Sequence, residues 1–192
     1  MPARTLAPRL DLPRQNAMLR AVIEDISGAP ALGPLLERIV ARACALIGAD
    51  RGTIGLVDEA RGVVRTAAVF NMPPGELGSE AGPGVGLAGE VLRTGAPVVA
   101  RRYARLARPL VPALGDDAVV GVPIVSDGRL IGVFGVGTAP GADGRPARGL
   151  GRREIATLEL FARHAAVAIE NARRYERERL RTERLALIAR IG

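Results

Sequence analysis

The sequence predicts an α+β fold in which one sheet is covered by alanine-rich helices. Three observations lead to this fold class: two β-rich hairpin patterns, helical periodicity towards both ends, and a composition that is 48% hydrophobic but only 3% aromatic. A core without tryptophan must be built from Val, Ile, Leu and Ala, which suits a sheet packed against helices. The 192 residues suffice for one domain with a sizeable core and an extension.

Two helices are predicted at the start of the chain. Pro13 can begin a helix that runs to about Ile26, where residues 27–30 break it. Pro34 opens a second helix whose apolar residues recur with helical period. Gly48 ends that helix.

Two hairpins follow, with a short helix between them. Between Gly52 and Phe70, two β-rich runs flank a turn-like segment. A glycine-rich helix and a short strand, 97–100, come next, and the second hairpin joins 118–125 to 130–138 through Asp127-Gly128. Residues 139–150 hold the densest Gly and Pro in the chain, so we expect a flexible loop there.

A single long helix is predicted from Gly151 to about Arg190. Its first half has an apolar seam suited to packing on a sheet or pairing with another helix. The seam consists of Ile155, Leu158, Ala162, Ala165, Ile169 and Ala172. Beyond Tyr175 the seam thins, and the closing residues resemble the entry helix of a following domain. We therefore expect the chain to be a fragment of a longer protein.

Two segments resemble the GAF domain family. Residues 82–99 read GPGVGLAGEVLRTGAPVV, similar to the glycine-rich loop, helix and strand at the centre of GAF domains; residues 158–176 resemble their last helix. The resemblance implies an antiparallel sheet of five or six strands, long terminal helices on one face, and short helices and loops capping a pocket on the other. It divides the chain into an extension and helix, 1–30, a GAF domain, 31–175, and a helical linker toward an output or second sensory domain, 176–192.

The resemblance also implies a function class. GAF domains of this type are non-catalytic regulatory modules, so we expect a small-molecule-sensing domain of a bacterial signal-transduction protein, such as a sensor histidine kinase. A homodimer through the terminal helices would relay the ligand state along the last helix. Two alternatives stay open: a ligandless dimerisation module, and a haem-binding redox or gas sensor. The sequence names neither ligand nor cofactor.

Basic residues crowd the segment expected to cap the pocket. Arg101, Arg102, Tyr103, Arg105 and Arg108 lie there, and arginines that point inward would select an anionic ligand through charge-assisted hydrogen bonds. We take Tyr103, Arg105 and Arg108 as candidate ligand-binding residues. A solvated loop is the alternative.

Two other motifs are interpreted structurally. Gly84, Gly86 and Gly89 match G-x-G-x-x-G, but a dinucleotide site needs a preceding strand and a following βαβ unit, which are missing. We expect a loop that requires positive φ before a helix. Asp116 and Asp117 are interpreted as a polar turn before a strand.

His164 and Cys44 are each the only residue of their type. His164 has apolar neighbours at helical spacing, which indicates a core or interface residue and gives only weak support to a haem ligand. Cys44 is predicted to be a small buried hydrophobe. A single cysteine excludes an intramolecular disulfide and a cysteine zinc cluster, and argues against the thiol chemistry of GAF-type methionine sulfoxide reductases. GAF domains that attach a bilin commonly do so through a cysteine in the pocket region, and residues 98–118 contain none, which argues against covalent bilin.

The net charge of +7 is unevenly distributed, because residues 171–192 contain seven Arg and three Glu. The alternation with acids is typical of a solvated, salt-bridged helix, and the shortage of aromatic residues speaks against nucleic acid. No stretch approaches the ~20 apolar residues that a membrane helix needs, and no signal peptide is evident. We expect a cytoplasmic domain without membrane contact.

Overall fold

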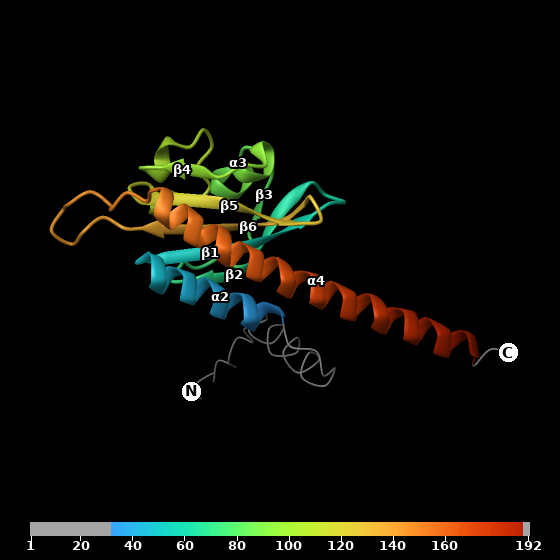
Figure 1. Cartoon of the computed structure of the whole chain (residues 1–192). Helices are drawn as coiled ribbons and strands as arrows, with labels where there is room; N and C mark the ends of the chain where they lie inside the picture. Colours follow the sequence, from blue (N-terminus) through green and yellow to red (C-terminus); the bar gives the residue numbers. More distant parts are fainter. Residues whose placement is uncertain (1–31, 190–192) are drawn as a thin grey trace, which may run out of the picture. The chain divides into compact units, whose positions relative to one another are not determined.

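The computed structural model describes residues 32–189, so the helix predicted from Pro13 to Ile26 lies outside the described residues. The described elements are helices and the strands of an antiparallel sheet (Figure 1). In chain order they are α2 (Leu32–Ile47), β1 (Arg51–Asp58), β2 (Val63–Phe70), β3 (Glu80–Ala81), α3 (Gly86–Thr94), β4 (Val98–Ala100), the 3₁₀ helices η1 (Tyr103–Arg105) and η2 (Pro112–Leu114), β5 (Ala118–Ser126), β6 (Arg129–Thr138) and α4 (Arg152–Ala189).

The strands form one six-stranded antiparallel sheet in the order β3-β2-β1-β6-β5-β4. This confirms the α+β class and the predicted sheet. Both hairpins are present, and Ser126 pairs with Arg129 so that Asp127 and Gly128 form the turn. The two-residue strand β3 was not predicted.

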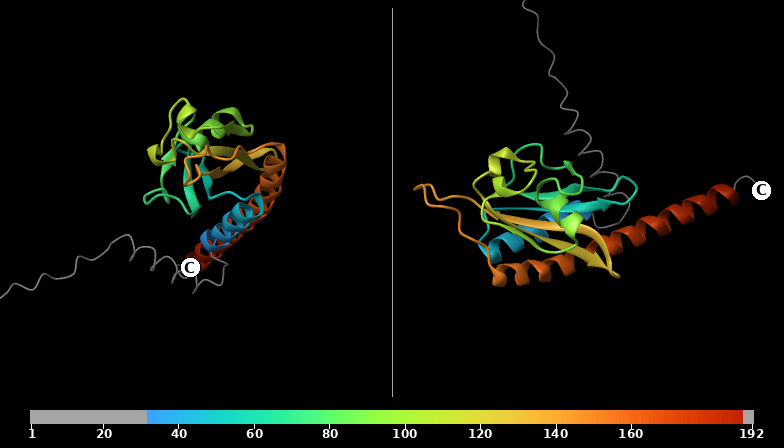
Figure 2. Two further views of the ribbon diagram at one scale, coloured as in Figure 1. Left: turned by 90° about the vertical axis from the view of Figure 1, so that its left-hand side faces the viewer. Right: turned by 90° about the horizontal axis from the view of Figure 1, so that it is seen from above.

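The helices cover the two faces of the sheet unequally. Helices α2 and α4 lie side by side on one face, and α3 lies on the other (Figures 1 and 2). Helix α2 begins at Leu32, two residues before the predicted start, because a proline is tolerated in the first turn of a helix. Helix α4 runs unbroken over 38 residues, close to the predicted bounds. No helix within residues 32–189 is long and apolar enough to cross a membrane.

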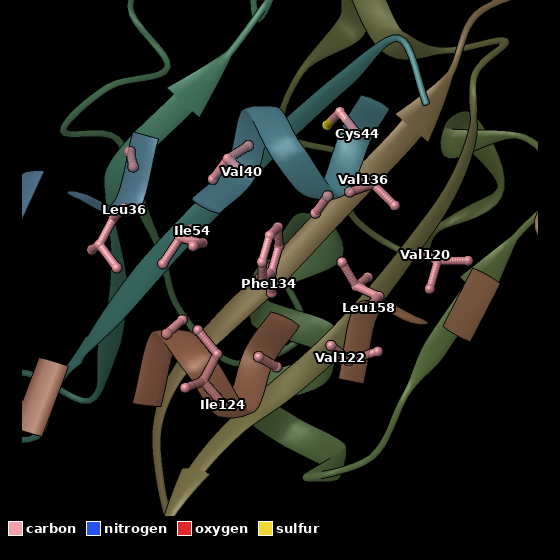
Figure 3. Packing of buried hydrophobic residues seen from close by; sticks show 14 of the residues in the cluster. Leu36, Val40, Cys44, Ile54, Val120, Val122, Ile124, Phe134, Val136 and Leu158 are labelled. Carbon is pink, nitrogen blue, oxygen red and sulfur yellow. The ribbon is translucent and has the colours of Figure 1, made fainter. Parts of the chain in front are cut away.

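The main core lies between the sheet and the pair α2 and α4. Phe134, Ile54 and Leu158 are fully buried there, and Figure 3 shows Phe134 pointing from β6 towards the two helices. Cys44 is also fully buried, and burial raises the pKa of its thiol to about 12. The thiol therefore stays protonated at neutral pH, which confirms the interpretation of Cys44 as a small buried hydrophobe.

Helix α3 approaches the opposite face closely because glycines stand beneath it. A Cβ on Gly121 of β5 would lie 3.0 Å from Leu87 Cγ, and one on Gly135 of β6 would lie 3.2 Å from Leu87 Cδ2. Such contacts leave no room for a methyl group without movement of Leu87. The two glycines thus set the depth at which α3 lies on the sheet.

Candidate ligand cavity

A cavity lies between the α3 face of the sheet, the start of α3 and the segment 103–117. This is where the resemblance placed a pocket. The volume is about 60 Å³, enough for a few water molecules and far below the roughly 300–1,000 Å³ of a pocket for a drug-sized ligand. The floor is formed by β1, β5 and β6, with Thr53, Val119, Val133 and Gly135 facing the space.

The glycine-rich loop forms one wall. Gly84 and Gly86 have φ of +75° and +60°, conformations that favour glycine. Gly84 N–H donates to the Gly89 carbonyl oxygen at 2.7 Å, and a Cβ on Gly89 would lie 2.0 Å from the Gly82 carbonyl oxygen. All three glycines of the G-x-G-x-x-G motif are therefore needed for the turn: Gly84 and Gly86 have the predicted positive φ, and Gly89 allows the close approach to Gly82.

Tyr103 fixes the position of segment 103–117, which we call the cap, over the cavity. Its side chain is buried, and its hydroxyl accepts hydrogen bonds from the backbone N–H groups of Leu110 at 3.0 Å and Val111 at 3.3 Å. Gly86 N–H donates to the Arg108 carbonyl oxygen at 2.7 Å, which ties the same cap segment to the start of α3. Burial raises the pKa of Tyr103, so the phenol stays neutral.

The three predicted ligand-binding residues are placed differently. Tyr103 lines the cavity, whereas Arg105 and Arg108 are exposed on the cap and do not line it. Arg102 is exposed as well and forms an ion pair with Asp116. The structure thus brings one of the three candidates to the cavity, and the ligand-binding role of all three stays a prediction.

A partly buried ion pair that sequence reasoning missed lies at the cavity. Arg51 Nε, at the start of β1, is 3.0 Å from Asp117 Oδ2, at the end of the cap, and the Asp117 side chain is only 4% exposed. The two atoms form an ion pair without the geometry of a hydrogen bond, and neither has another hydrogen-bond partner within the described part of the chain. Desolvation raises the pKa of Asp117, and the Arg51 guanidinium partly opposes this rise.

Further polar groups line the β2 side of the cavity. Thr66 Oγ1 lies 3.0 Å from Ser79 Oγ, and Glu76 is half-buried with its pKa raised, mainly by desolvation. The cavity therefore combines one guanidinium, two carboxyl groups and several hydroxyls with an apolar wall. Such a set can orient a small polar molecule that carries both hydrogen-bond donors and acceptors.

Of the two positions predicted for His164, core or interface, the structure contradicts the core position. His164 is exposed on α4, on the sheet face opposite the cavity, and its ring meets Phe161 edge-on at a centroid distance of 6.2 Å. Its apolar neighbours Leu160 and Val167 are themselves exposed, so they do not bury it. An interface position stays a prediction. Among residues 32–189, no three His, Cys, Asp or Glu side chains gather closely enough to hold a metal ion.

The sheet, the paired helices and the capped cavity define a class of α+β regulatory domains. The chain belongs to the GAF domain family, whose model matches residues 32–170. Members of this family are regulatory or sensory domains of signalling proteins and are generally non-catalytic. No curated protein matches the sequence significantly.

Three solved structures illustrate the fold similarity. The GAF domain of a phosphoenolpyruvate-protein phosphotransferase from Acinetobacter is 19% identical, with 85% of this chain and 98% of that one covered and a TM-score of 0.65. A methyl-accepting chemotaxis protein, residues 122 to 287, is 20% identical, with 73% and 90% covered and a TM-score of 0.59. A free methionine-R-sulfoxide reductase from Neisseria meningitidis, in complex with its substrate, is 19% identical, with 91% and 99% covered and a TM-score of 0.61. At these identities the similarity establishes the fold.

Proposed function

We propose that this chain is the small-molecule-sensing GAF domain of a bacterial signal-transduction protein, of the sensor histidine kinase type. The ligand binds in the cavity beside Arg51 and Asp117, and α4 relays the ligand state to an output domain. The chemotaxis protein among the similar structures supports a signalling role. In this proposal the domain itself is not an enzyme.

The observation that carries the proposal is the two-sided contact of β5. Val119 and Gly121 of this strand face the cavity side, while Val120 and Val122 belong to the core that contains Leu158 of α4. A ligand that displaces Val119 or Asp117 therefore moves a strand on which α4 packs directly. This geometry supports a population shift between two packings of α4.

Exposed apolar residues support a homodimer through the terminal helices. On α4, Leu160 is 45% and Val167 is 62% exposed, with His164 between them, and on α2 Leu46 is 69% exposed. Residues 160, 164 and 167 share one side of the helix at spacings of four and three. Pairing of two copies along this side would cover these residues and set two α4 helices beside each other.

In this proposal, the ligand-binding roles of Tyr103, Arg105 and Arg108 depend on movement of the cap. Tyr103 contacts the ligand from inside the cavity, and Arg105 and Arg108 approach an anionic ligand only after the cap has moved. Movement of the cap also enlarges a space that is too small for most metabolites in the closed arrangement.

The small volume favours one alternative, a ligandless dimerisation module. With about 60 Å³ and walls formed largely by Val, Leu, Ala and Gly, the cavity resembles an imperfectly packed second core as well as a closed binding site. In that case the domain binds no ligand and only holds two chains together in a dimer.

Native mass spectrometry of the purified chain separates these functions. A dimer with a defined extra mass, lost in Arg51→Met and retained in Arg65→Met, would support the sensor. Arg65 is the matched control because it is an exposed arginine on β2 outside the cavity. A dimer without an adduct, together with no thermal shift across a metabolite library, would favour the ligandless module. A monomer at micromolar concentration would refute the dimer relay.

A further inference from the structure

A second hollow of the molecule lies outside the cavity, between the β5–β6 hairpin end and the second half of α4. This groove has a volume of about 610 Å³. The hairpin contributes Arg129, and α4 contributes arginines at spacings of one, three and four residues. The five arginines of the groove are Arg129, Arg173, Arg174, Arg177 and Arg181.

Only part of this positive charge is neutralised. Arg129 is paired with Glu59 outside the groove, and Arg173 lies 3.9 Å from Glu170. Arg174, Arg177 and Arg181 have no carboxylate within ion-pair distance in the described part of the chain. Five arginines stand against three acidic residues of the groove, Asp127, Glu170 and Glu178.

The opposite side of the same helix is arranged differently. Arg179 lies 3.4 Å from Glu176 and 3.5 Å from Glu183, so this side has the expected pattern of a salt-bridged helix. On the groove side, Arg174, Arg177 and Arg181 follow one another at spacings of three and four. Like charges at these spacings repel each other and destabilise the helix. An anion in the groove would remove this repulsion.

We propose that the groove binds an oligophosphate, a ligand with three or more linked phosphate groups. The planar guanidinium donates two parallel hydrogen bonds to phosphate oxygens, which makes arginine well suited to this chemistry. Arg174 and Arg181 are seven residues apart, about 10 Å along the helix axis. A single phosphate cannot span this distance, whereas a chain of phosphates contacts several arginines at once.

The lining also restricts what else the ligand carries. Ile131 is the one apolar residue of the lining, and no aromatic side chain belongs to it. A nucleobase would find neither a stacking surface nor an apolar wall. Recognition rests on the phosphate chain, and the ligand bridges the hairpin and α4 at the point where the helix leaves the sheet.

Calorimetric titration with sodium tripolyphosphate tests the proposal. The chain should bind tripolyphosphate at least about tenfold more tightly than monophosphate. The groove pair, Arg174→Gln with Arg181→Gln in one chain, should weaken binding by about tenfold or more. Each charge-assisted hydrogen bond contributes roughly that factor. The control pair Arg65→Gln with Arg179→Gln removes the same charge outside the groove and should change binding less than about twofold.

A second readout follows the helix directly. Hydrogen exchange of residues 170–185 should slow on addition of tripolyphosphate in the parent chain and in the control pair, and should stay unchanged in the groove pair. If the groove pair loses helix content by circular dichroism, Arg174→Lys with Arg181→Lys keeps the charge without the guanidinium fork and should still weaken binding.

Three results would overturn the proposal. One is the absence of tripolyphosphate binding by the parent chain, and another is an equal loss in the groove and control pairs, which indicates bulk charge. The third is tighter binding, through the same arginines, of a single-stranded oligonucleotide or of phosphatidylserine vesicles, which would assign the groove to a nucleic acid or a membrane surface.

Discussion

The two faces of the sheet are made by the same strands but are packed differently. Towards α2 and α4, Ile54, Val120 and Phe134 are fully buried in a continuous apolar core. Their chain neighbours Thr53, Val119 and Gly135 point towards α3 and border the cavity. One face is filled by large side chains, while the other is kept partly empty by glycine and threonine.

This difference separates the face that stabilises the fold from the face that contains the cavity. Most of the buried side chains lie on the helix face and are closely packed. Removing side-chain volume from such a core lowers the free energy of unfolding. The cavity face can tolerate an uncommon group, the Arg51–Asp117 pair, only because the other face holds the fold. Strand β5 contributes Val120 to the helix face and Val119 to the cavity face, so it connects the two faces.

The largest expected effect comes from emptying the helix face. Phe134→Ala should lower the free energy of unfolding by about 3–5 kcal/mol, since it removes a fully buried ring from the centre of the core. Urea denaturation followed by circular dichroism measures this. A loss below about 1 kcal/mol would show that the two faces do not differ as described.

A methyl group on the cavity face tests how tightly the glycine-rich loop is built. Gly89→Ala should cost about 1–3 kcal/mol, because its Cβ would lie 2.0 Å from the Gly82 carbonyl oxygen and the loop must shift. Gly33→Ala is the control, since nothing lies within 4 Å of a Cβ there and alanine favours the helix. Equal effects of the two substitutions would contradict the structural role of the motif.

An identical truncation on adjacent residues compares the faces directly. Val120→Ala empties the helix face and Val119→Ala enlarges the existing cavity. Val120→Ala should be the more destabilising, by about 1 kcal/mol, because a site that already borders empty space loses fewer contacts. Thermal unfolding of the two variants side by side would show it, and a reversed order would place the better packing on the cavity face.

Local patterns predicted most of the fold. The β1–β2 and β5–β6 hairpins follow from β-rich runs and an Asp-Gly turn, and α4 follows from its apolar periodicity. Strand β3 was missed because two residues are too few to establish a strand pattern. Each success depends on neighbours in the sequence, which is the information that periodicity contains.

The candidate site required contacts between distant residues. Arg51 and Asp117 meet only because β1 and β5 both pair with β6, so neither residue stands out in its own segment. Asp117 has the sequence context of a turn, and its burial depends on the cap above it. The core alternative for His164 failed for a related reason, since apolar neighbours bury a residue only when another element covers them.

The smallest expected effect is the pH dependence of stability that Asp117 contributes. Its pKa in the folded state is raised above the ordinary value of 3.8, chiefly by desolvation, so the folded state holds this proton more tightly than the unfolded state. Between 3.8 and the folded-state pKa, stability therefore falls as pH rises, and the penalty is complete above that window. Asp117→Asn removes this titration, so the stability of the parent chain relative to the variant should fall across the window and then level off.

The effect is limited because Arg51 Nε lies 3.0 Å away and favours the ionised carboxylate. Urea unfolding of both proteins at half-unit steps from pH 4 to 7 measures the difference. A difference that rises with pH would mean that Arg51 outweighs desolvation, and the cavity would then hold a stabilising ion pair.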